Sequence, residues 1–195
     1  MSFDACPTGE APGFAADVVQ FLRDSKVPAT FFISGAWAET NASAVRTLSK
    51  VPFFELALHG QAHPSLVDAP PALVRDEIVG GKATLARMGI RTSPLFRPPF
   101  GDMPPGLAAI ARQNGVMPVL FDTGLGDPDR SRSAEILERD AIRWVQAGSI
   151  ILLHVNGRGY ATAQTVKELV PLLQSRGYRF VTVSELARLC DMPSP

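Results

Sequence analysis

Short apolar runs alternate with longer segments of helical pattern along the whole chain, and this alternation limits the fold more than any other feature. Most runs are rich in Phe, Val, Ile or Leu and show little polar alternation, which is typical of strands buried on both faces of a parallel sheet. We predict strands over residues 1–4, 29–34, 53–58, 95–97, 117–122, 149–154 and 179–183. Between them, apolar residues at helical spacing predict helices over residues 15–25, 36–49, 71–88, 105–114, 134–146, 161–176 and 184–189.

Start and stop signals support several of these helices. Pro71 suits the first turn of its helix, where a missing N–H costs little. Gly89, Gly115 and Gly177 each follow a predicted helix end and suit a C-terminal cap. Ser184 begins the last predicted helix and is its predicted N-cap.

A strand followed by a helix, repeated about seven times, implies parallel strands joined by crossover helices. Such a sheet either stays open or closes into a barrel. Polar residues at or just beyond the predicted strand ends favour a barrel, because its strand ends converge on one rim. These residues are Asp4, His59, Arg97, Asp122 and His154. We therefore predict an α/β barrel of about seven strands, and the lack of an internal linker predicts one domain over residues 1–195.

The charges of the chain balance, with 19 Lys and Arg against 19 Asp and Glu, so no nucleic-acid or anionic-membrane partner is expected. No apolar run approaches the roughly 20 residues that a membrane-spanning helix needs. The first residues lack the pattern of a signal peptide. The compartment stays unknown: cytoplasmic by default, secreted if a longer precursor exists. Two cysteines, Cys6 and Cys190, are too few for a disulfide framework, so reduced thiols are expected.

The three histidines of the chain all fall at predicted strand ends or in the loop that follows one. His59 and His63 are four residues apart, a spacing that lets two imidazoles meet one metal ion. The alternative is a pair of surface loop histidines, and Pro64 argues against a continuing helix there. His154 follows four aliphatic residues, where a hydrogen-bonded core histidine is the alternative to a catalytic one.

Charged residues at other strand ends are further candidates. Asp4 ends the first predicted strand, where a carboxylate either takes part in chemistry or caps a loop. Arg97 lies among aromatic residues and needs a carboxylate partner if it is buried. Asp122 and the turn at 127–129 offer such partners, and a structural ion pair is the alternative. Cys6 is a nucleophile, a soft metal ligand or a small buried residue.

Five segments, taken in order, resemble the motifs of the NodB-homology polysaccharide deacetylases, carbohydrate esterase family 4. The resemblance runs nearly end to end, and the order of the motifs makes it specific. The segments are S-F-D-A-C-P (2–7), H-G-Q-A-H-P (59–64), R-P-P-F-G (97–101), the stretch from F-D to Asp127 (121–127) and I-L-L-H (151–154). The tail over residues 176–186 is similar to the closing strand and helix of the family.

The resemblance implies a distorted (β/α)7 barrel and the hydrolysis of N- or O-linked acetyl groups on a polysaccharide or related carbohydrate. It implies that Asp4 is the general base that deprotonates the attacking water. It assigns Arg97 to positioning Asp4, and Asp127 to orienting Arg97. It makes His154 the general acid that protonates the leaving amine or alkoxide. Such a division of base and acid work suits a carbonyl that a metal has polarised.

The resemblance also implies a divalent metal, zinc or a substitute, bound by His59 and His63. It assigns Leu152 to the small pocket for the acetyl methyl group and places Phe100 in substrate binding.

This sequence departs from the family pattern in several places. Ala5 replaces the usual metal-binding Asp and Cys6 the usual Gly, so the metal must find a third partner: water, Asp4 or the Cys6 thiolate. Gly60 stands where the family has Ser or Thr, and Pro128 follows Asp127 where the family has Trp. After His154, the sequence V-N-G-R-G (155–159) replaces the usual Asp and resembles a divergent subgroup that pairs F-D-A-C-P-T with H-V-N-G-R-G. We therefore expect a weak or atypical metal site.

Two other functions compete with deacetylation. One is hydrolysis of a small amide or ureide, because related barrels include allantoinase-like enzymes. The other is a degenerate barrel that binds glycans without hydrolysis, which Ala5 favours. The presence of Asp4, Arg97 and His154 argues against the degenerate barrel, because a binding module needs no acid–base pair.

Overall fold

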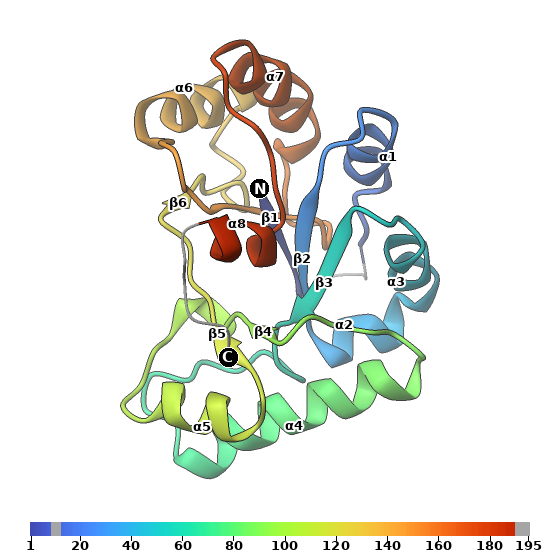
Figure 1. Ribbon diagram of the computed structural model, residues 1–195, viewed down its shortest axis with the longest axis vertical. Coiled ribbons are helices and arrows are strands. Elements are labelled where there is room, and N and C mark those ends of the chain that lie inside the picture. The colour runs from blue at the N-terminus through green and yellow to red at the C-terminus, as the bar shows by residue number, and fades with distance from the viewer. Residues whose placement is uncertain (9–12, 190–195) are drawn as a thin grey trace.

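The computed structural model describes residues 1–8 and 13–189, and its centre is a sheet of seven parallel strands. The strands are β1 (Ser2–Ala5), β2 (Ala29–Ile33), β3 (Phe54–Leu58), β4 (Leu95–Phe96), β5 (Met117–Pro118), β6 (Thr123–Gly124) and β7 (Ile151–His154). Their order is β5-β4-β3-β2-β1-β7-β6. The sheet curls, so the predicted distorted (β/α)7 barrel is confirmed as an incomplete barrel with β5 and β6 at its edges (Figure 1).

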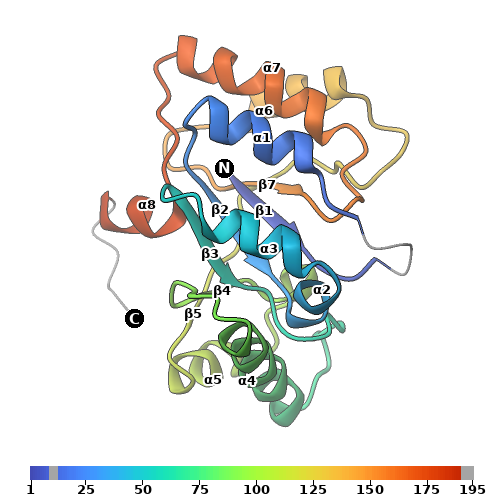
Figure 2. The same cartoon turned by 90° about the vertical axis from the view of Figure 1, so that its right-hand side faces the viewer.

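Most of the helices connect the strands and cover the outside of the sheet, while the last helix is bonded to Thr30 and Glu55 at the N-terminal ends of two strands. They are α1 (Ala16–Asp24), α2 (Gly35–Thr40), α3 (Ala42–Ser49), α4 (Pro71–Arg87), α5 (Leu107–Gln113), α6 (Ala134–Trp144), α7 (Thr162–Ser175), α8 (Val183–Leu189) and the short 3-10 helix η1 (Pro99–Gly101). Helix α7 packs against α1 and α6, and α4 packs against α2 and α5, so two helical groups flank the strands (Figure 2). None of the helices within the described residues is long and apolar enough to cross a membrane.

The predicted helix signals hold at most positions. Pro71 occupies the first turn of α4, and Gly89, Gly115 and Gly177 take the left-handed conformation after their helices, at φ values of 73°, 71° and 85°. The predicted helix over 36–49 is wrong as one element, because Asn41 leaves the helical region and separates α2 from α3.

Two predicted strands differ from the structure. The segment 117–122 is not one strand: after β5 the chain crosses the gap of the barrel and pairs with β7 through Thr123–Gly124. The segment 179–183 forms no strand, because the Val183 N–H bonds the Thr30 hydroxyl at 2.8 Å rather than a neighbouring strand. Thr182 supplies the N-terminal cap that we predicted for Ser184, since its hydroxyl accepts the N–H of Glu185 at 3.2 Å.

Successive strand residues face opposite sides of the sheet, and the two sides differ in character. On β1, Phe3 and Ala5 belong to the main apolar cluster beneath the helices. The intervening Asp4 is also buried and hydrogen-bonds the Arg97 guanidinium. A second, small apolar cluster contains Phe32 and Val183. The interior of the barrel is therefore partly polar, which suits it to chemistry at the rim.

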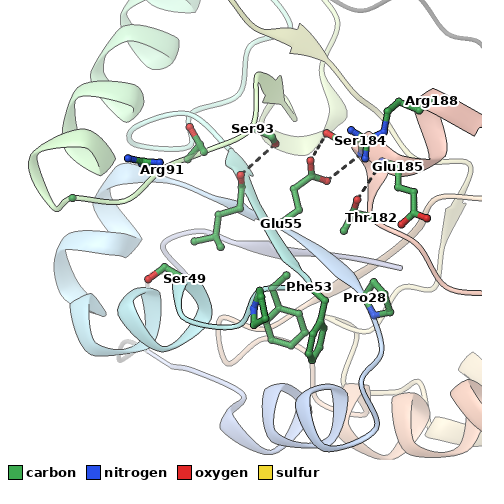
Figure 3. A pocket seen from close by; sticks show the side chains of 15 residues that line it. Pro28, Ser49, Phe53, Glu55, Arg91, Ser93, Thr182, Ser184, Glu185 and Arg188 are labelled. Carbon is green, nitrogen blue, oxygen red and sulfur yellow. Dashed lines mark hydrogen bonds between the residues drawn. The ribbon is translucent and has the colours of Figure 1, made fainter.

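A cavity of about 730 Å³ lies at the N-terminal ends of β2, β3 and β4, away from the histidines (Figure 3). Its central carboxylate, that of Glu55, is engaged within the fold. The Glu55 carboxylate accepts the hydroxyls of Thr30 and Ser184 and the N–H of Ser184. These bonds hold α8 against the sheet, so we infer that this end of the barrel stabilises the fold.

The loop that carries the H-x-x-x-H pair is held by Glu77, a buried carboxylate on α4. It accepts the backbone N–H groups of residues 61–63 at 2.9 to 3.2 Å. Gly60 takes φ +79°, and a Cβ there would lie 2.5 Å from Glu77 Oε2. The approach of Glu77 therefore explains why this chain has glycine at position 60.

We predict that Glu77→Ala lowers the free energy of unfolding by about 2 kcal/mol, because it leaves three partly buried backbone N–H donors, those of residues 61–63, without an acceptor. Urea unfolding measures the change. The matched control is Asp76→Ala, whose carboxylate is 68% exposed on the same helix and should change stability by no more than about 0.5 kcal/mol. Equal effects of the two substitutions would show that Glu77 does not anchor the loop.

Candidate active site

Side chains from four strand ends meet at the C-terminal rim of the barrel. Asp4 lies on β1 directly beside His154 on β7, His59 follows β3, and Arg97 follows β4. A cavity of about 190 Å³ opens there, and its lining is Asp4, Cys6, His63, Phe100, Gly101, Phe121, Pro128, Leu152, His154 and Arg158. The structure thus places the predicted catalytic, metal-binding and substrate-binding residues around one site.

A buried ion pair joins Asp4 to Arg97. Arg97 Nη1 lies 2.7 Å from Asp4 Oδ1, while Nη2 donates to the Ser2 hydroxyl at 2.9 Å. The guanidinium lies over the ring of Phe32, 3.9 Å from its centroid. Burial disfavours the Asp4 carboxylate, but the charges of Arg97 and the nearby histidines outweigh it and hold the pKa of Asp4 below its usual value. Asp4 is therefore ionised at neutral pH.

His59 is fixed in one tautomer by its environment. Its Nδ1 lies 2.7 Å from the carbonyl oxygen of Arg97, which can only accept, so Nδ1 carries the proton. Burial lowers the pKa of His59, so the ring is neutral and Nε2 offers a lone pair. That nitrogen lies 3.4 Å from Asp4 Oδ2.

His63 lies beside His59 with its backbone in the left-handed conformation at φ 64°. The two imidazole centroids are 4.8 Å apart, and the ring of Phe100 covers His63 at 4.5 Å. Burial, aided by His59, lowers the pKa of His63 to about 4. Both histidines are therefore neutral at pH 7, as metal ligands must be.

Cys6 lies with His59 and His63 in a group of side chains of the kinds that bind metal ions. Within the described ranges 1–8 and 13–189, Cys6, His59 and His63 each offer a donor atom, and these atoms lie within 4.8 Å of one another. One ion bound at roughly 2.0–2.3 Å from each donor needs only small side-chain movements. The methyl group of Ala5 lies in the apolar cluster instead. The donor set of this chain therefore fits a divalent ion of the softer kind.

His154 is oriented by Asp127. Its Nδ1 lies 2.9 Å from Asp127 Oδ1, and its backbone N–H donates to Oδ2 at 2.8 Å. The Thr162 hydroxyl donates to the same carboxylate. Burial disfavours the imidazolium, but the hydrogen bond and charge of Asp127, helped by Asp4, raise the pKa of His154 above its ordinary value.

The predicted role of Asp127 therefore needs correction. We expected Asp127 to orient Arg97, but Arg97 bonds Asp4 and Ser2 while Asp127 bonds His154. The reason is position: Asp127 follows β6, the neighbour of β7, whereas Arg97 follows β4. Asp122, which we placed among the rim residues, lies elsewhere, because it accepts the Ser149 hydroxyl and the Ile150 N–H before β7 begins.

Several residues of the site were not foreseen from the sequence, among them Ser2, Glu77 and Asn156. Ser2 shares a face of β1 with Asp4, and strand alternation was the signal that could have revealed it. Glu77 and Asn156 hold the histidine loop and Cys6, respectively, through contacts far apart in sequence. No local sequence pattern predicts such contacts.

A model of the polysaccharide deacetylase family matches residues 1–119, which are more than half of the chain. The peptidoglycan-N-acetylglucosamine deacetylase of Bacillus cereus is 29% identical over 182 residues, which cover 92% of this chain and 84% of the relative. The chitooligosaccharide deacetylase of Bradyrhizobium is 25% identical over 202 residues, which cover 95% and 89% of the two chains.

Solved structures share the fold. The family 4 acetyl xylan esterase from Clostridium thermocellum, solved with a cobalt ion, has a TM-score of 0.84 and 28% identity over 98% of this chain and 91% of that one. A CE4 family pseudoenzyme from Bacillus anthracis has a TM-score of 0.83 at 20% identity, over 95% of this chain and 64% of that one. From the family match and the shared incomplete barrel, we conclude that this chain belongs to the CE4, or NodB-homology, family of polysaccharide deacetylases.

Proposed function

We propose that this protein is a metal-dependent hydrolase that removes N- or O-linked acetyl groups from a polysaccharide or related carbohydrate. The observation that carries the proposal is the pairing of Asp4 and His154 at one cavity, each held by a buried partner, beside two neutral histidines. The names of the relatives agree, since they describe deacetylases of peptidoglycan N-acetylglucosamine and of chitooligosaccharides, and an acetyl xylan esterase.

His59 and His63 would hold the divalent metal, which we propose to be zinc. The chemistry supplied by such an ion is polarisation of the acyl carbonyl and acidification of water. The two imidazoles are suited to the task because burial keeps them neutral and His59 Nε2 carries a lone pair.

Asp4 would act as the general base. Arg97, which is itself bonded to the Ser2 hydroxyl, fixes the carboxylate through Oδ1, and this leaves Oδ2 on the side of His59 to accept a proton from the attacking water. Because the pKa of Asp4 is lowered, the carboxylate is unprotonated at neutral pH and free to accept a proton, but it is a weak base. It therefore depends on a water that has itself been made more acidic.

His154 would act as the general acid. Asp127 binds its Nδ1, so Nε2 is the nitrogen that can donate a proton to the leaving amine or alkoxide. The raised pKa of His154 keeps the imidazole protonated closer to neutral pH. The apolar lining from Leu152 and Phe121 suits a methyl group, and Phe100, which is 64% exposed, offers a face for a sugar ring.

We predict that Asp4→Asn lowers the rate of acetate release by roughly 10²- to 10⁴-fold, the usual loss when a positioned general base is removed. Acetate release from N-acetylglucosamine oligomers and from acetylated xylooligosaccharides, with zinc or cobalt added, measures it. The control is Asp24→Asn, which removes a carboxylate that is 61% exposed on α1 and should leave the rate unchanged.

Other results of the same assay distinguish the competing functions. Binding of the oligosaccharides without acetate release from the metal-loaded wild type would indicate a degenerate glycan-binding barrel. Hydrolysis of a small ureide but not of the acetylated sugars would indicate the allantoinase-like alternative. Either result would overturn the proposed function.

We predict that His154→Ala lowers kcat far more than it changes KM on an N-acetyl substrate, because a general acid acts in the transition state. An activated aryl acetate has a leaving group that needs no proton, so kcat on that ester should fall much less. Steady-state kinetics of one variant on both substrates provides the comparison. Equal losses of kcat would identify His154 as a structural residue.

We predict that Asp127→Asn lowers the pKa of His154, because the substitution removes the charge that stabilises the imidazolium. NMR titration of the metal-free protein measures the pKa, and three histidines keep the spectrum simple. Asp129→Asn is the control, since that carboxylate bonds Ser131 in the same turn.

The sign of the linked stability follows from the raised pKa. The charged His154–Asp127 pair stabilises the fold fully below the unfolded-state pKa of about 6.5, and this contribution is lost as the pH rises through the folded-state value. The stability difference between wild type and Asp127→Asn should shrink over that range. A difference that grows with pH would contradict the assignment.

A further inference from the structure

Two departures from the family pattern, 150 positions apart in sequence, contact each other in the fold. The side-chain Nδ2 of Asn156 donates to the Cys6 carbonyl oxygen at 2.9 Å and lies 3.2 Å from the Cys6 Sγ. Asn156 is fully buried and Cys6 nearly so. Cys6 follows β1 and Asn156 follows β7, and these two strands are neighbours in the sheet. The Val155 N–H also bonds the Asp4 carbonyl, so the two chains stay side by side past the last paired residues. The unusual residues of the first and fifth motifs thus form one structural unit.

The orientation of the Asn156 amide is fixed by its other contact. Its Oδ1 accepts the backbone N–H of Arg158 at 3.3 Å, so Nδ2 is the atom that faces sulfur. The backbone of Asn156 and Gly157 is also packed closely against Gly13. A Cβ on Gly13 would lie 2.7 Å from the Gly157 Cα and 2.9 Å from the backbone carbonyl oxygen of Asn156. This tight packing leaves Asn156 little freedom to move away from Cys6.

The sulfur of Cys6 lies where a metal ligand is needed. Its Sγ and the donor nitrogens of His59 and His63 lie within 4.8 Å of one another, and Cys6 lines the same cavity as Asp4 and His154. We propose that the Cys6 thiolate is the third protein ligand of the divalent ion, with Asn156 as the positioning residue that holds the sulfur. This inference concerns the site of the proposed function and does not depend on which acyl group is hydrolysed.

Asp4 is the alternative third protein ligand, but the proposed function already assigns it the role of general base. Its Oδ1 is bonded to Arg97, and a carboxylate that also bound the ion would be a poorer base. On binding, the thiol gives its proton to solvent and its sulfur lone pair to the ion, with no change in oxidation state. A donor N–H aimed at sulfur suits the resulting thiolate. A set of one sulfur and two imidazoles favours zinc or cobalt over magnesium, calcium or manganese.

Cobalt substitution tests the ligand directly, without any measurement of hydrolysis. The protein should carry Cys190→Ser, which removes the other cysteine of the chain, a residue outside the described part. We expect a thiolate-to-cobalt charge-transfer band in this protein and its loss in the Cys6→Ser, Cys190→Ser double variant. A band that persists in the double variant, or no band in the parent, would overturn the proposal.

X-ray absorption of the zinc-loaded Cys190→Ser protein keeps the proposal testable even if Cys6→Ser fails to fold. We expect one sulfur at about 2.3 Å from zinc, and a shell of nitrogen and oxygen alone would overturn the proposal. Asn156→Ala should retain the sulfur but lower zinc affinity by about 10- to 100-fold, as loss of a partner that orients a ligand does. Competition with a chromophoric chelator measures that affinity, and an unchanged value would remove Asn156 from the inference.

The two proposals fail in different ways. Sulfur coordination without acetate release would leave the ligand assignment in place and overturn the deacetylase function. Acetate release from a protein whose metal has no sulfur ligand would leave the deacetylase function in place and overturn the ligand assignment.

Discussion

The buried pair of Arg97 and Asp4 is the interaction on which the rest of the site depends. Arg97 follows β4 and Asp4 lies on β1, with β2 and β3 between them in the sheet, so the guanidinium bridges the inside of the curled sheet. A buried arginine is costly unless its charge is paired, and here the carboxylate, the Ser2 hydroxyl and the Phe32 ring surround it. The carbonyl of the same residue fixes the tautomer of His59. One residue therefore stabilises the ionised Asp4 carboxylate and also determines which nitrogen of His59 carries the lone pair.

Local patterns predicted most of the fold because its elements are set by apolar periodicity and by helix-end residues. The strands that pair along their full length, β1, β2, β3 and β7, match the predicted runs to within one or two residues. The errors arose where long-range contacts decide the outcome. The segment 179–183 has the apolar residues of a strand, but Thr30 and Glu55 bond its end and the start of α8. Asn41 divides a helix whose apolar pattern continues through it.

The rim residues could be predicted because parallel strand ends converge, and the motifs name their positions. Their pairing could not be predicted, because it depends on which strands become neighbours. The sheet order places β6 beside β7, and so Asp127 orients His154 rather than Arg97. The replacement of the usual Asp by Ala5 suggested a weakened metal site when considered alone. The contact between Cys6 and Asn156 places two of these departures side by side in the fold, which no inspection of the separate motifs could show.

The incomplete barrel has a consequence for how the chain behaves at high concentration. A sheet that does not close keeps two edges, and unpaired edges are templates for pairing with another molecule. Here each edge strand is only two residues long, and one of them ends in Pro118, which lacks a backbone donor. Such short edges offer few free backbone groups with which a strand of another molecule could pair. The protein can thus leave its barrel open without inviting edge-to-edge aggregation.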